Sequence, residues 1–352
     1  MVKVSVILLN WNQWRYTVAC LDSLKKQSLR DFEVIIVDNG SEDDSVPKLK
    51  KYISRNRSLT IQLFQARKNL GFAAGNNQGI AKSQGEYIAL VNNDSTVNRD
   101  YLKEQAGVLD RDESIAIVGA KVYNKYEKKE YLFEEYGTTT LTGMYAGMPG
   151  IDRHTRALVE SFAISGGAMM FRRKAGLPFD PDYFIYHEDT YFSWKQRLLG
   201  FRNASTPGAV MKHEGSATVR DARHMSNRFI YLGERNRVMT LFICYGFGTF
   251  VRVAPMLAAS VLLLNIYDVK HALTRMRSYG WLILNIQTLI KKHVRMQRNR
   301  RVRDREIIKS MSFKLVDEKH ISSPLHRYLV KGLNSFFRLY AKIAGLRALD
   351  IK

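Results

Sequence analysis

The stretch YIALVNNDS, residues 87–95, places a run of strand-forming residues directly before two amides and a carboxylate. A short apolar run of this kind is typical of a buried β-strand. Asn92, Asn93 and Asp94 would then lie at the carboxyl end of that strand. They predict either a strand that ends in an Asx-turn or a polar edge that meets a ligand.

Residues 1–125 repeat this pattern, because short β-rich runs alternate with helical ones. The expected strands are residues 2–10, 32–39, 59–66, 87–94 and 115–123, and the expected helices are residues 16–27, 45–56, 76–84 and 99–110. Strands rich in Val, Ile and Leu that are separated by helices predict an α/β fold with a mostly parallel central sheet and helices on both faces. Ligands of such sheets bind at the carboxyl ends of the strands. The loops after Asn10, Asn39, Ala66 and Asn93 are therefore the expected site.

The composition is that of a folding chain. Its 352 residues, 45% of them apolar, suffice for one large domain with an appendage or for two modest domains. The two cysteines, Cys20 and Cys244, are far apart in sequence, which gives no support to a disulfide framework or a zinc site and favours a reducing compartment. The opening residues lack the pattern of a cleaved signal and predict a first strand.

The net charge of +22 is concentrated near the C-terminal end. Residues 271–352 contain 19 Lys and Arg against 5 Asp and Glu. Such a basic segment is expected to contact anionic lipid or nucleic acid.

The motif IIVDNGSEDDS, residues 35–45, ends a predicted strand in Asp38 and continues into a turn at Gly40. A carboxylate at this edge can accept hydrogen bonds from a base or a ribose. Asp and Ser also form Asx-turns and helix caps, so a purely structural role is the alternative.

The motif RKNLGFAAGNNQGI, residues 67–80, mixes glycines and free amides just before a predicted helix. These residues are Gly71, Gly75 and Gly79 with Asn69, Asn76 and Asn77. Glycine lets a phosphate approach the backbone, and free amides can meet it there. The motif matches neither a dinucleotide fingerprint nor a Walker A loop. An ordinary glycine-rich turn is the alternative.

A single carboxylate, Asp94, can help to hold Mg²⁺ or Mn²⁺ if a diphosphate supplies the other oxygen ligands. Asn92 and Asn93 would then be neutral hydrogen-bonding groups. His213, at the end of the strand-like run in VMKHEGSAT, is a further candidate ligand. A lone histidine is more often structural.

The motif HEDTYFSWKQRLLG, residues 187–200, places Glu188 and Asp189 at the start of an amphipathic helix. A carboxylate at such a junction can serve as a general base for an acceptor hydroxyl. The aromatic stretch DYFIYH before it could form a pocket wall. Acidic residues in a first helical turn are also favoured by the helix dipole alone, which is the structural alternative.

Seven motifs in this order resemble those of family 2 glycosyltransferases, particularly the rhamnosyltransferase-like branch that builds surface glycans. They are VSVILLNWN, IIVDNGSEDDS, NLGFAAGNNQGI, YIALVNNDS, SGGAMMFRR, YHEDTYFSWKQRLLG and HEGSAT, all within residues 2–237. The resemblance implies a GT-A fold and an inverting transfer of a sugar from a nucleotide-diphosphate donor with a divalent metal. It also implies a glycosyltransferase domain at residues 1–237 and a helical, apolar and basic region at residues 238–352.

The resemblance also implies roles for single residues. Asp189 is the expected base, and Asp94 and His213 are the expected metal-side residues. Nucleotide-sugar contacts are expected from Asn10, Trp11, Asn12, Asp38, Asn69, Gly71, Gly75, Asn76 and Asn93. Acceptor-side positions are Gly166, Gly167 and Glu188. Two positions depart from the family pattern, because Asn92 replaces the first acid of the Asp-x-Asp signature and Tyr191 replaces the last acid of EDxD.

The apolar segment after residue 237 predicts contact with a membrane. Residues 253–267 carry no charge, which gives about 22 Å of helix against a hydrocarbon core of about 30 Å. We favour an in-plane or re-entrant helix pair hinged near Pro255. A span within residues 238–267 and a buried soluble helix pair are the alternatives. The basic run after Lys291 would attract the anionic cytoplasmic leaflet, so we expect an enzyme on the cytoplasmic face of the cell membrane with a lipid-linked or glycan acceptor.

Two other function classes compete with this interpretation. The basic tail, with Trp281 and His293, could bind nucleic acid, but its aromatics are not interleaved as stacking platforms, so no nucleic-acid partner is expected. A nucleotidyltransferase on a related sheet usually has a glycine-rich loop directly after its first strand, where this chain has NWNQW.

Overall fold

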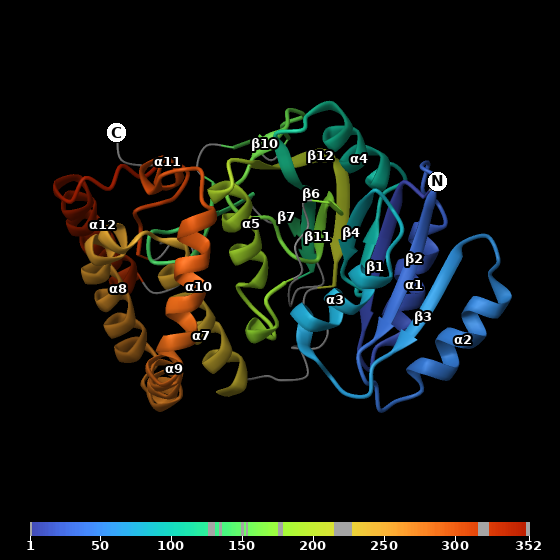
Figure 1. Ribbon diagram of the computed structural model, residues 1–352, viewed down its shortest axis with the longest axis horizontal. Helices are drawn as coiled ribbons and strands as arrows, with labels where there is room; N and C mark the ends of the chain where they lie inside the picture. The colour runs from blue at the N-terminus through green and yellow to red at the C-terminus, as the bar shows by residue number, and fades with distance from the viewer. Residues whose placement is uncertain are drawn as a thin grey trace.

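The computed structural model describes residues 2–125, 131–133, 136–148, 151–152, 154–174, 179–214, 227–315 and 324–349. Figure 1 shows two neighbouring parts, a twisted sheet with flanking helices and a cluster of C-terminal helices beside it. Residues 215–218 of the HEGSAT motif lie outside the described residues.

The central sheet has ten strands, and its main path runs in the order β10-β12-β6-β11-β4-β1-β2-β3. These strands are β1 Val4–Asn10, β2 Phe32–Asp38, β3 Thr60–Gln65, β4 Tyr87–Val91, β6 Ile115–Lys125, β10 Val159–Glu160, β11 Ala168–Arg172 and β12 Arg202–His213, with β5 Ser95–Val97 and β7 Tyr131–Phe133 at its side. Strands β1, β2, β3, β4, β6 and β12 run in the same direction, whereas β11 is reversed between β4 and β6. A separate hairpin pairs β8 Gly137–Thr139 with β9 Tyr145–Gly147.

Helices cover both faces of this sheet, as the sequence predicts. On one face, α1 Trp14–Leu24, α2 Ser45–Arg55 and α4 Tyr101–Arg111 bury Leu21, Leu49 and Leu102 against the strands. On the other face, α3 Gly71–Lys82 and α5 Glu188–Leu198 bury Ala73 and Trp194. The fully buried strands β2 and β4 lie between these two apolar layers, which confirms the predicted α/β fold.

The C-terminal helices extend the second apolar layer. They are α7 Asn227–Cys244, α8 Phe247–Tyr267, α9 Ala272–Leu284, α10 Ile286–Asn299, α11 Asp304–Ile308 and α12 Pro324–Ile343. Buried residues of these helices, such as Met239, Met256 and Leu289, belong to the same cluster as Trp194. Helix α7 also runs across residue 237, so the two parts of the chain share a helix.

The helix pair within residues 238–267 is hinged at a different residue from the one expected. Pro255 lies inside α8, and the chain turns between α7 and α8 at Gly246. Gly246 has an extended backbone, and its N–H donates to the Asp304 carboxylate at 2.8 Å. The prediction of a hinge near Pro255 was therefore wrong, because a fixed turn outside the helix already redirects the chain.

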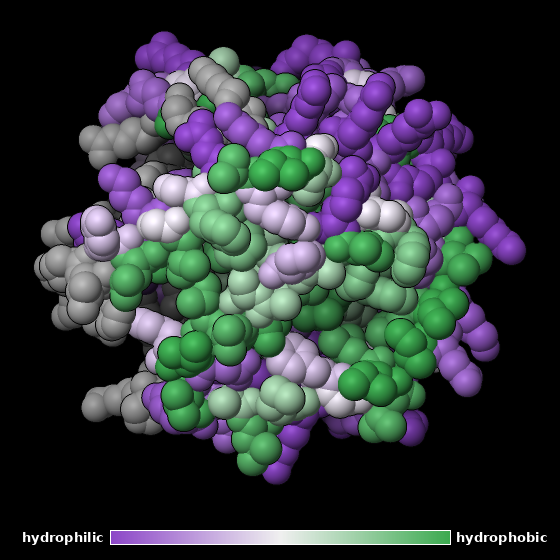
Figure 2. Space-filling view, turned by 90° about the vertical axis from the view of Figure 1, so that its left-hand side faces the viewer, coloured by the Kyte–Doolittle hydropathy of each residue, from purple (hydrophilic) through white to green (hydrophobic). Residues whose placement is uncertain are grey.

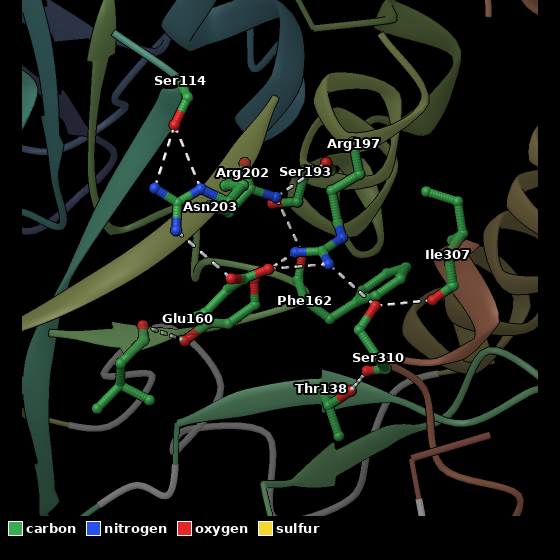
Figure 3. A network of polar contacts seen from close by, with 12 residues as sticks. Ser114, Thr138, Glu160, Phe162, Ser193, Arg197, Arg202, Asn203, Ile307 and Ser310 are labelled. Carbon is green, nitrogen blue, oxygen red and sulfur yellow. Dashed lines mark hydrogen bonds and ion pairs between the residues drawn. The ribbon is translucent and has the colours of Figure 1, made fainter. Parts of the chain in front are cut away.

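A polar network fastens the segment after α11 to the sheet part (Figure 3). The Arg197 guanidinium of α5 donates to the Ser310 hydroxyl at 3.1 Å, to the Glu160 carboxylate at 3.2 Å and to the Ser161 carbonyl at 3.3 Å. The Thr138 hydroxyl donates to the Ser310 carbonyl at 2.6 Å. One arginine thus joins a helix, an edge strand and the C-terminal region.

One helix in the described part of the chain, Phe247–Tyr267, is long and apolar enough to cross a membrane by length and composition.

Candidate active site

Polar residues from separate strands meet at one edge of the sheet. Because β1, β2, β4 and β12 are parallel, their carboxyl ends bring Asn10, Asp38, Asp94 and His213 to this edge. The reversed strand β11 begins at the same edge, because Ala168 pairs with Val91, and this brings Gly166 and Gly167 to it. The fold thus brings these candidate residues together at the carboxyl ends of the strands, where ligands of such sheets bind.

Asp38 is fully buried and is the centre of a hydrogen-bond network. Its carboxylate accepts from Asn10 Nδ2 at 2.8 Å, from the Ser41 hydroxyl at 2.6 Å and from the Ser41 N–H at 3.0 Å. The Thr17 hydroxyl donates to Asn10 Oδ1 at 2.8 Å and accepts from Asn93 Nδ2 at 3.0 Å. This network fixes the position of the edge, since each of these buried groups has a partner.

An open pocket of about 450 Å³ lies beside this network. It is lined by Trp11, by the turn of Gly40, Ser41 and Glu42, and by residues 65–69 after β3. Asn12 has a φ of 55°, and its side-chain oxygen accepts from the Glu42 N–H at 2.8 Å, which ties the two loops together. Trp11 keeps 37% of its surface exposed, so an aromatic ring is available at the pocket rim.

Asn39 holds the loop that leads into α3. Its side-chain oxygen accepts from the Leu70 N–H at 3.0 Å, and its Nδ2 donates to Asn69 Oδ1 at 3.1 Å and to the Gly71 carbonyl at 3.2 Å. Gly40, with a φ of 74°, lies so close to this loop that a Cβ there would be 2.5 Å from the Lys68 carbonyl carbon. Asn69 therefore reaches the pocket on a backbone that Asn39 fixes.

We expected the glycine-rich motif to lie just before a helix, but most of the motif is part of the helix itself. Helix α3 begins at Gly71, and Gly75 and Gly79 lie within it. A Cβ on Gly75 would approach Leu9 to 2.7 Å, so this glycine allows close packing of α3 on β1. Asn76 is buried and donates to the Phe72 carbonyl of its own helix. Neither Gly75 nor Asn76 lines the pocket beside Trp11.

Asp94 and His213 are neighbours because β5 pairs with β12. His213 Nε2 lies 3.1 Å from Asp94 Oδ1 and 3.2 Å from Asn92 Nδ2. His213 Nδ1 lies 2.7 Å from Asn124 Oδ1, an acceptor, which places a hydrogen on Nδ1. In the neutral imidazole, Nε2 then directs a lone pair toward the carboxylate. This contact is favourable when a proton on Nε2 or a cation lies between the two groups.

This donor set suits a divalent cation that keeps other oxygen ligands. A carboxylate oxygen and an imidazole nitrogen are ordinary ligands of Mg²⁺ or Mn²⁺ when phosphate or water completes the shell. Among the residues that the structure describes, no group of three or more His, Cys, Asp or Glu forms a metal cluster. Asp94 and His213 alone would supply two ligands, and a divalent cation held there would take its other ligands from phosphate or water.

Gly167 makes room for Asn92. A Cβ on Gly167 would lie 2.2 Å from the carboxamide carbon of Asn92, and the Asn92 N–H donates to the Gly167 carbonyl at 2.9 Å. Only glycine fits at this position without displacing the amide that contacts His213.

Asp189 is held at the amino end of α5. One carboxylate oxygen accepts from the Gly166 N–H at 3.0 Å, and the other accepts from the Thr190 N–H at 2.6 Å. Protein around the carboxylate raises the pKa of Asp189, although these backbone donors oppose the shift. The side chain also lines a small cavity of about 130 Å³ beside Ser165 and Tyr145. Asp189 is therefore an oriented carboxylate with raised basicity.

Glu188, next to Asp189, faces a different environment. Its Oε2 is buried without a hydrogen-bond partner, and it does not line the cavity beside Asp189. Burial, with the charge of Asp189, raises the pKa of Glu188 well above its usual range. The two adjacent acids thus differ in their hydrogen bonds. Asp189 is a carboxylate held by two backbone donors, whereas Glu188 favours its neutral form.

A strained loop places this acid pair. Phe184, Tyr186 and His187 all have positive φ values, of 59°, 71° and 64°. Such conformations are costly for residues other than glycine and persist only when surrounding contacts impose them. Burial, with nearby Arg237, lowers the pKa of His187 to about 4, so this residue is neutral near pH 7.

Asn236 of α7 supplies the restraining contacts. Its Nδ2 donates to the carbonyls of Tyr183, Ile185 and Tyr186 at 2.8 to 2.9 Å. The Arg235 guanidinium donates to Asn236 Oδ1 at 2.8 Å and to the Asp182 carbonyl. Phe184 in turn touches α3, because its carbonyl accepts from the Ala73 N–H at 3.2 Å. The loop therefore links α3, α5 and α7.

Two residues of this edge carried no sequence signal of their own. Thr17 and Asn124 act through contacts with Asn93 and His213, which are distant in sequence, so only the assembled sheet reveals them. Asn236 differs, because the polar run ERNR interrupts an otherwise apolar helix. A polar group at a predicted buried position signals a specific partner.

A comparison with family models matches the first half of the chain. Residues 5–176 match the model described as glycosyl transferase family 2. These residues are a family 2 glycosyltransferase domain. The match ends between Gly167 and the acid pair, so the predicted base lies beyond it.

Curated relatives are similar to part of this chain. Poly(ribitol-phosphate) beta-N-acetylglucosaminyltransferase TarS of Staphylococcus aureus is 30% identical over 139 residues, which is 38% of this chain and 24% of TarS. Glycosyltransferase GlyG of Streptococcus pneumoniae is 27% identical over 135 residues, 38% of this chain and 44% of GlyG. The alignments thus span about a quarter of TarS and less than half of GlyG.

A solved structure shares the fold. GalNAc-T7 with UDP, GalNAc and Mn²⁺ superposes with a TM-score of 0.59 at 16% identity, covering 80% of this chain and 57% of that one. This likeness supports the GT-A fold that the motifs of the family 2 domain predict.

Proposed function

We propose that the chain is an inverting glycosyltransferase that moves a sugar from a nucleotide-diphosphate donor to a hydroxyl of a glycan or lipid-linked acceptor. One observation carries the proposal: Asp38, Asp94 and Asp189 lie along a single edge of a family 2 glycosyltransferase sheet. In this proposal Asp38 belongs to the nucleotide site, Asp94 to the metal beside the diphosphate, and Asp189 to the acceptor hydroxyl.

The donor would bind where the Asp38 network meets the open pocket. Trp11 and Asn69 line this space, while Asn10 holds Asp38 as a hydrogen-bond acceptor and Asn12 holds the turn at Glu42 beside it. The pocket combines an exposed aromatic ring with fixed polar groups, which suits a nucleoside. Gly71 and Asn93 extend this polar surface toward the expected diphosphate.

Asp94 and His213 would hold the divalent metal, Mg²⁺ or Mn²⁺, and the metal when bound supplies positive charge near the leaving diphosphate. The likeness to GalNAc-T7, whose structure contains UDP and Mn²⁺, supports dependence on a divalent metal, without bearing on which residues hold it. Asn92 contributes a neutral amide beside His213, kept in place by the space at Gly167.

Asp189 would act as the general base. Its raised pKa makes it a better proton acceptor, and the Gly166 N–H fixes the oxygen that faces the acceptor loop. As Asp189 takes the proton, the acceptor oxygen forms a bond to the anomeric carbon. The bond from that carbon to the diphosphate oxygen breaks at the opposite face, and the diphosphate leaves with the electron pair. A single displacement inverts the configuration and needs no protein nucleophile.

The acceptor and the location belong to the same proposal. The likeness to TarS, named for a poly(ribitol-phosphate) acceptor, supports a role in surface glycan synthesis. The apolar and basic region after residue 237 supports attachment to the cytoplasmic face of the membrane, with Gly166, Gly167 and Glu188 toward the acceptor. The rhamnosyltransferase-like branch stays a prediction, and no nucleic-acid partner is proposed.

A panel of nucleotide sugars, tested for metal-dependent hydrolysis and transfer, examines this function. We expect one donor to be consumed with Mn²⁺ or Mg²⁺, and Asp189→Asn to lower transfer by about 10²- to 10⁴-fold. Asp112→Asn is the matched control, since Asp112 lies beside the opposite edge of the sheet, where it pairs with Arg202.

Equal transfer by Asp189→Asn and the control would remove Asp189 from the role of base. Consumption of no nucleotide sugar by folded protein with either metal would overturn the proposed function.

A further inference from the structure

Helix α8 has an apolar stripe on its exposed side. Thr249, Val253, Met256 and Ser260 mark the buried side, which packs against the protein. The exposed side carries Phe247, Val251, Leu262 and Ile266, with exposed fractions between 53% and 73%. A surface helix of a water-soluble protein normally presents polar residues on this side. Helix α8 is therefore apolar on both sides, although only one contacts protein.

Neighbouring helices extend this apolar surface. Helix α9 exposes Leu273, Met276, Ile283 and Leu284, and α12 exposes Leu329, Phe336, Leu339 and Ile343. Figure 2 shows the end of the molecule formed by these helices, where a broad apolar area is bordered by hydrophilic side chains along its upper and right-hand edges. A continuous apolar surface of this kind marks an interaction site.

The charge of the same helices indicates which kind of partner would bind this surface. Helices α8, α9, α10 and α12 contain eleven Lys and Arg and no Asp or Glu. Lys291, Arg295 and Arg298 of α10 are exposed next to Ile290 and Val294. Asp268, between α8 and α9, is paired with Arg275. An apolar surface on helices that carry only cationic charges is complementary to lipid tails beneath anionic headgroups. Two copies joined through this face would bring cationic borders together, which disfavours a dimer.

We propose that the exposed face of α8, α9 and α12 docks on an anionic lipid bilayer, with α8 lying in the plane of the membrane surface. This inference specifies the contact for the membrane attachment that is part of the proposed function. The outward side chains of α8 would enter the acyl boundary, and the basic side chains of α10 and α12 would meet the headgroups.

An in-plane position follows from the contacts of α8. Val253, Met256 and Leu257 belong to the main apolar cluster of the protein. The Arg252 guanidinium donates to the Ala344 carbonyl at 3.3 Å, and the Tyr340 hydroxyl donates to the Arg252 carbonyl at 2.8 Å, which joins α8 to α12. A spanning helix would lose these contacts and bring the buried hydroxyls of Thr249 and Ser260 into lipid. One side of α8 thus packs against the protein, and the other side would contact the bilayer.

Vesicle sedimentation with the full chain tests the inference. We expect binding to vesicles of phosphatidylcholine with phosphatidylglycerol, and weaker binding to phosphatidylcholine alone or at high salt. Leu262→Glu should lower the partition coefficient at least about tenfold, because it removes apolar contact and adds a repelled charge. Leu158→Glu is the matched control, since this leucine is also exposed but precedes β10 in the sheet part.

Each other outcome overturns the proposal. Equal vesicle binding by both variants would place the contact elsewhere. Resistance of the wild-type protein to alkaline extraction would indicate a span, and a dimer in light scattering that Leu262→Glu abolishes would indicate a second copy. Hydrolysis of the nucleotide sugar without vesicles is measured in parallel. If the wild-type protein hydrolyses no nucleotide sugar, the proposed function is contradicted. If it hydrolyses the nucleotide sugar but does not bind vesicles, only this docking face is contradicted.

Discussion

At the carboxyl edge of the sheet, polar side chains such as Asn10, Thr17 and Asp38 are buried, whereas at the C-terminal end apolar side chains such as Leu284 and Ile343 are exposed. Both arrangements depart from the usual distribution of residues. The two regions differ in what these side chains contact. The buried polar groups satisfy one another within the chain, whereas the exposed apolar groups are not covered on their outer side by the residues that the structure describes. Substitutions at the edge should therefore change the stability of the fold, and substitutions at the C-terminal end should change association with a membrane.

The largest effect is expected at the centre of the polar network. Asp38→Ala leaves three hydrogen-bond donors, from Asn10 and Ser41, without their acceptor. We expect a loss of about 3 kcal/mol in the free energy of unfolding and a raised KM for the nucleotide sugar. Urea denaturation and steady-state kinetics measure the two effects. Asp44→Ala, an exposed carboxylate of the same loop, is the control, and equal stability of the two variants would contradict a structural role for the network.

A second substitution tests the link between α7 and the strained loop. Asn236→Ala removes the donor to three carbonyls, so we expect a loss of about 2 kcal/mol. We also expect kcat to fall more than KM changes, because the acid pair loses its fixed position. Asn299→Ala, at an exposed asparagine that bonds only within its own helix turn, is the comparison. Unchanged kcat in Asn236→Ala would show that the loop keeps its shape without this residue.

Glu188 provides a prediction about pH. Its raised pKa means that the folded protein keeps a proton that the unfolded chain loses above its ordinary pKa of about 4.5. Stability therefore falls as pH rises from that value toward the pKa in the folded state, by up to ~1.4 kcal/mol per pH unit. Glu188→Gln should remove this slope. Thermal unfolding between pH 5 and pH 8 measures it, and parallel curves for wild type and variant would contradict the raised pKa.

The smallest effect on stability is expected at the exposed apolar end. Leu284→Gln, at a side chain that is 87% exposed, should change the free energy of unfolding by less than ~0.5 kcal/mol. Leu282→Ala, two residues earlier on α9 but buried, should cost about 2 kcal/mol or more. Denaturation of both variants without lipid measures this contrast. A large loss from Leu284→Gln would mean that this side chain already has a partner within the chain.

The alternating strands and helices of residues 1–125 could be predicted because each strand is apolar along its length and each helix has its own periodicity. The position of Asp38 and Asp94 at one edge follows from the expected parallel strands, whereas His213 joins them through the pairing of β12 with β5 and β6. The direction of β11 could not be predicted in this way, and it is this reversal that brings Gly166 to Asp189. The start of α3 was placed too late, since Gly71 and Gly75 suggested a loop, whereas close packing against Leu9 decides in favour of a helix.

The Asn236 clamp also has a consequence for biosynthesis. The loop that carries the acid pair is complete once residue 189 has been made, but its restraint is supplied by a residue 47 positions later, on α7. A chain that ends before α7 would therefore contain the whole family 2 match, residues 5–176, but would lack the donor that holds the loop before the acid pair. This restraint on the loop becomes possible only after the helical C-terminal part has been made.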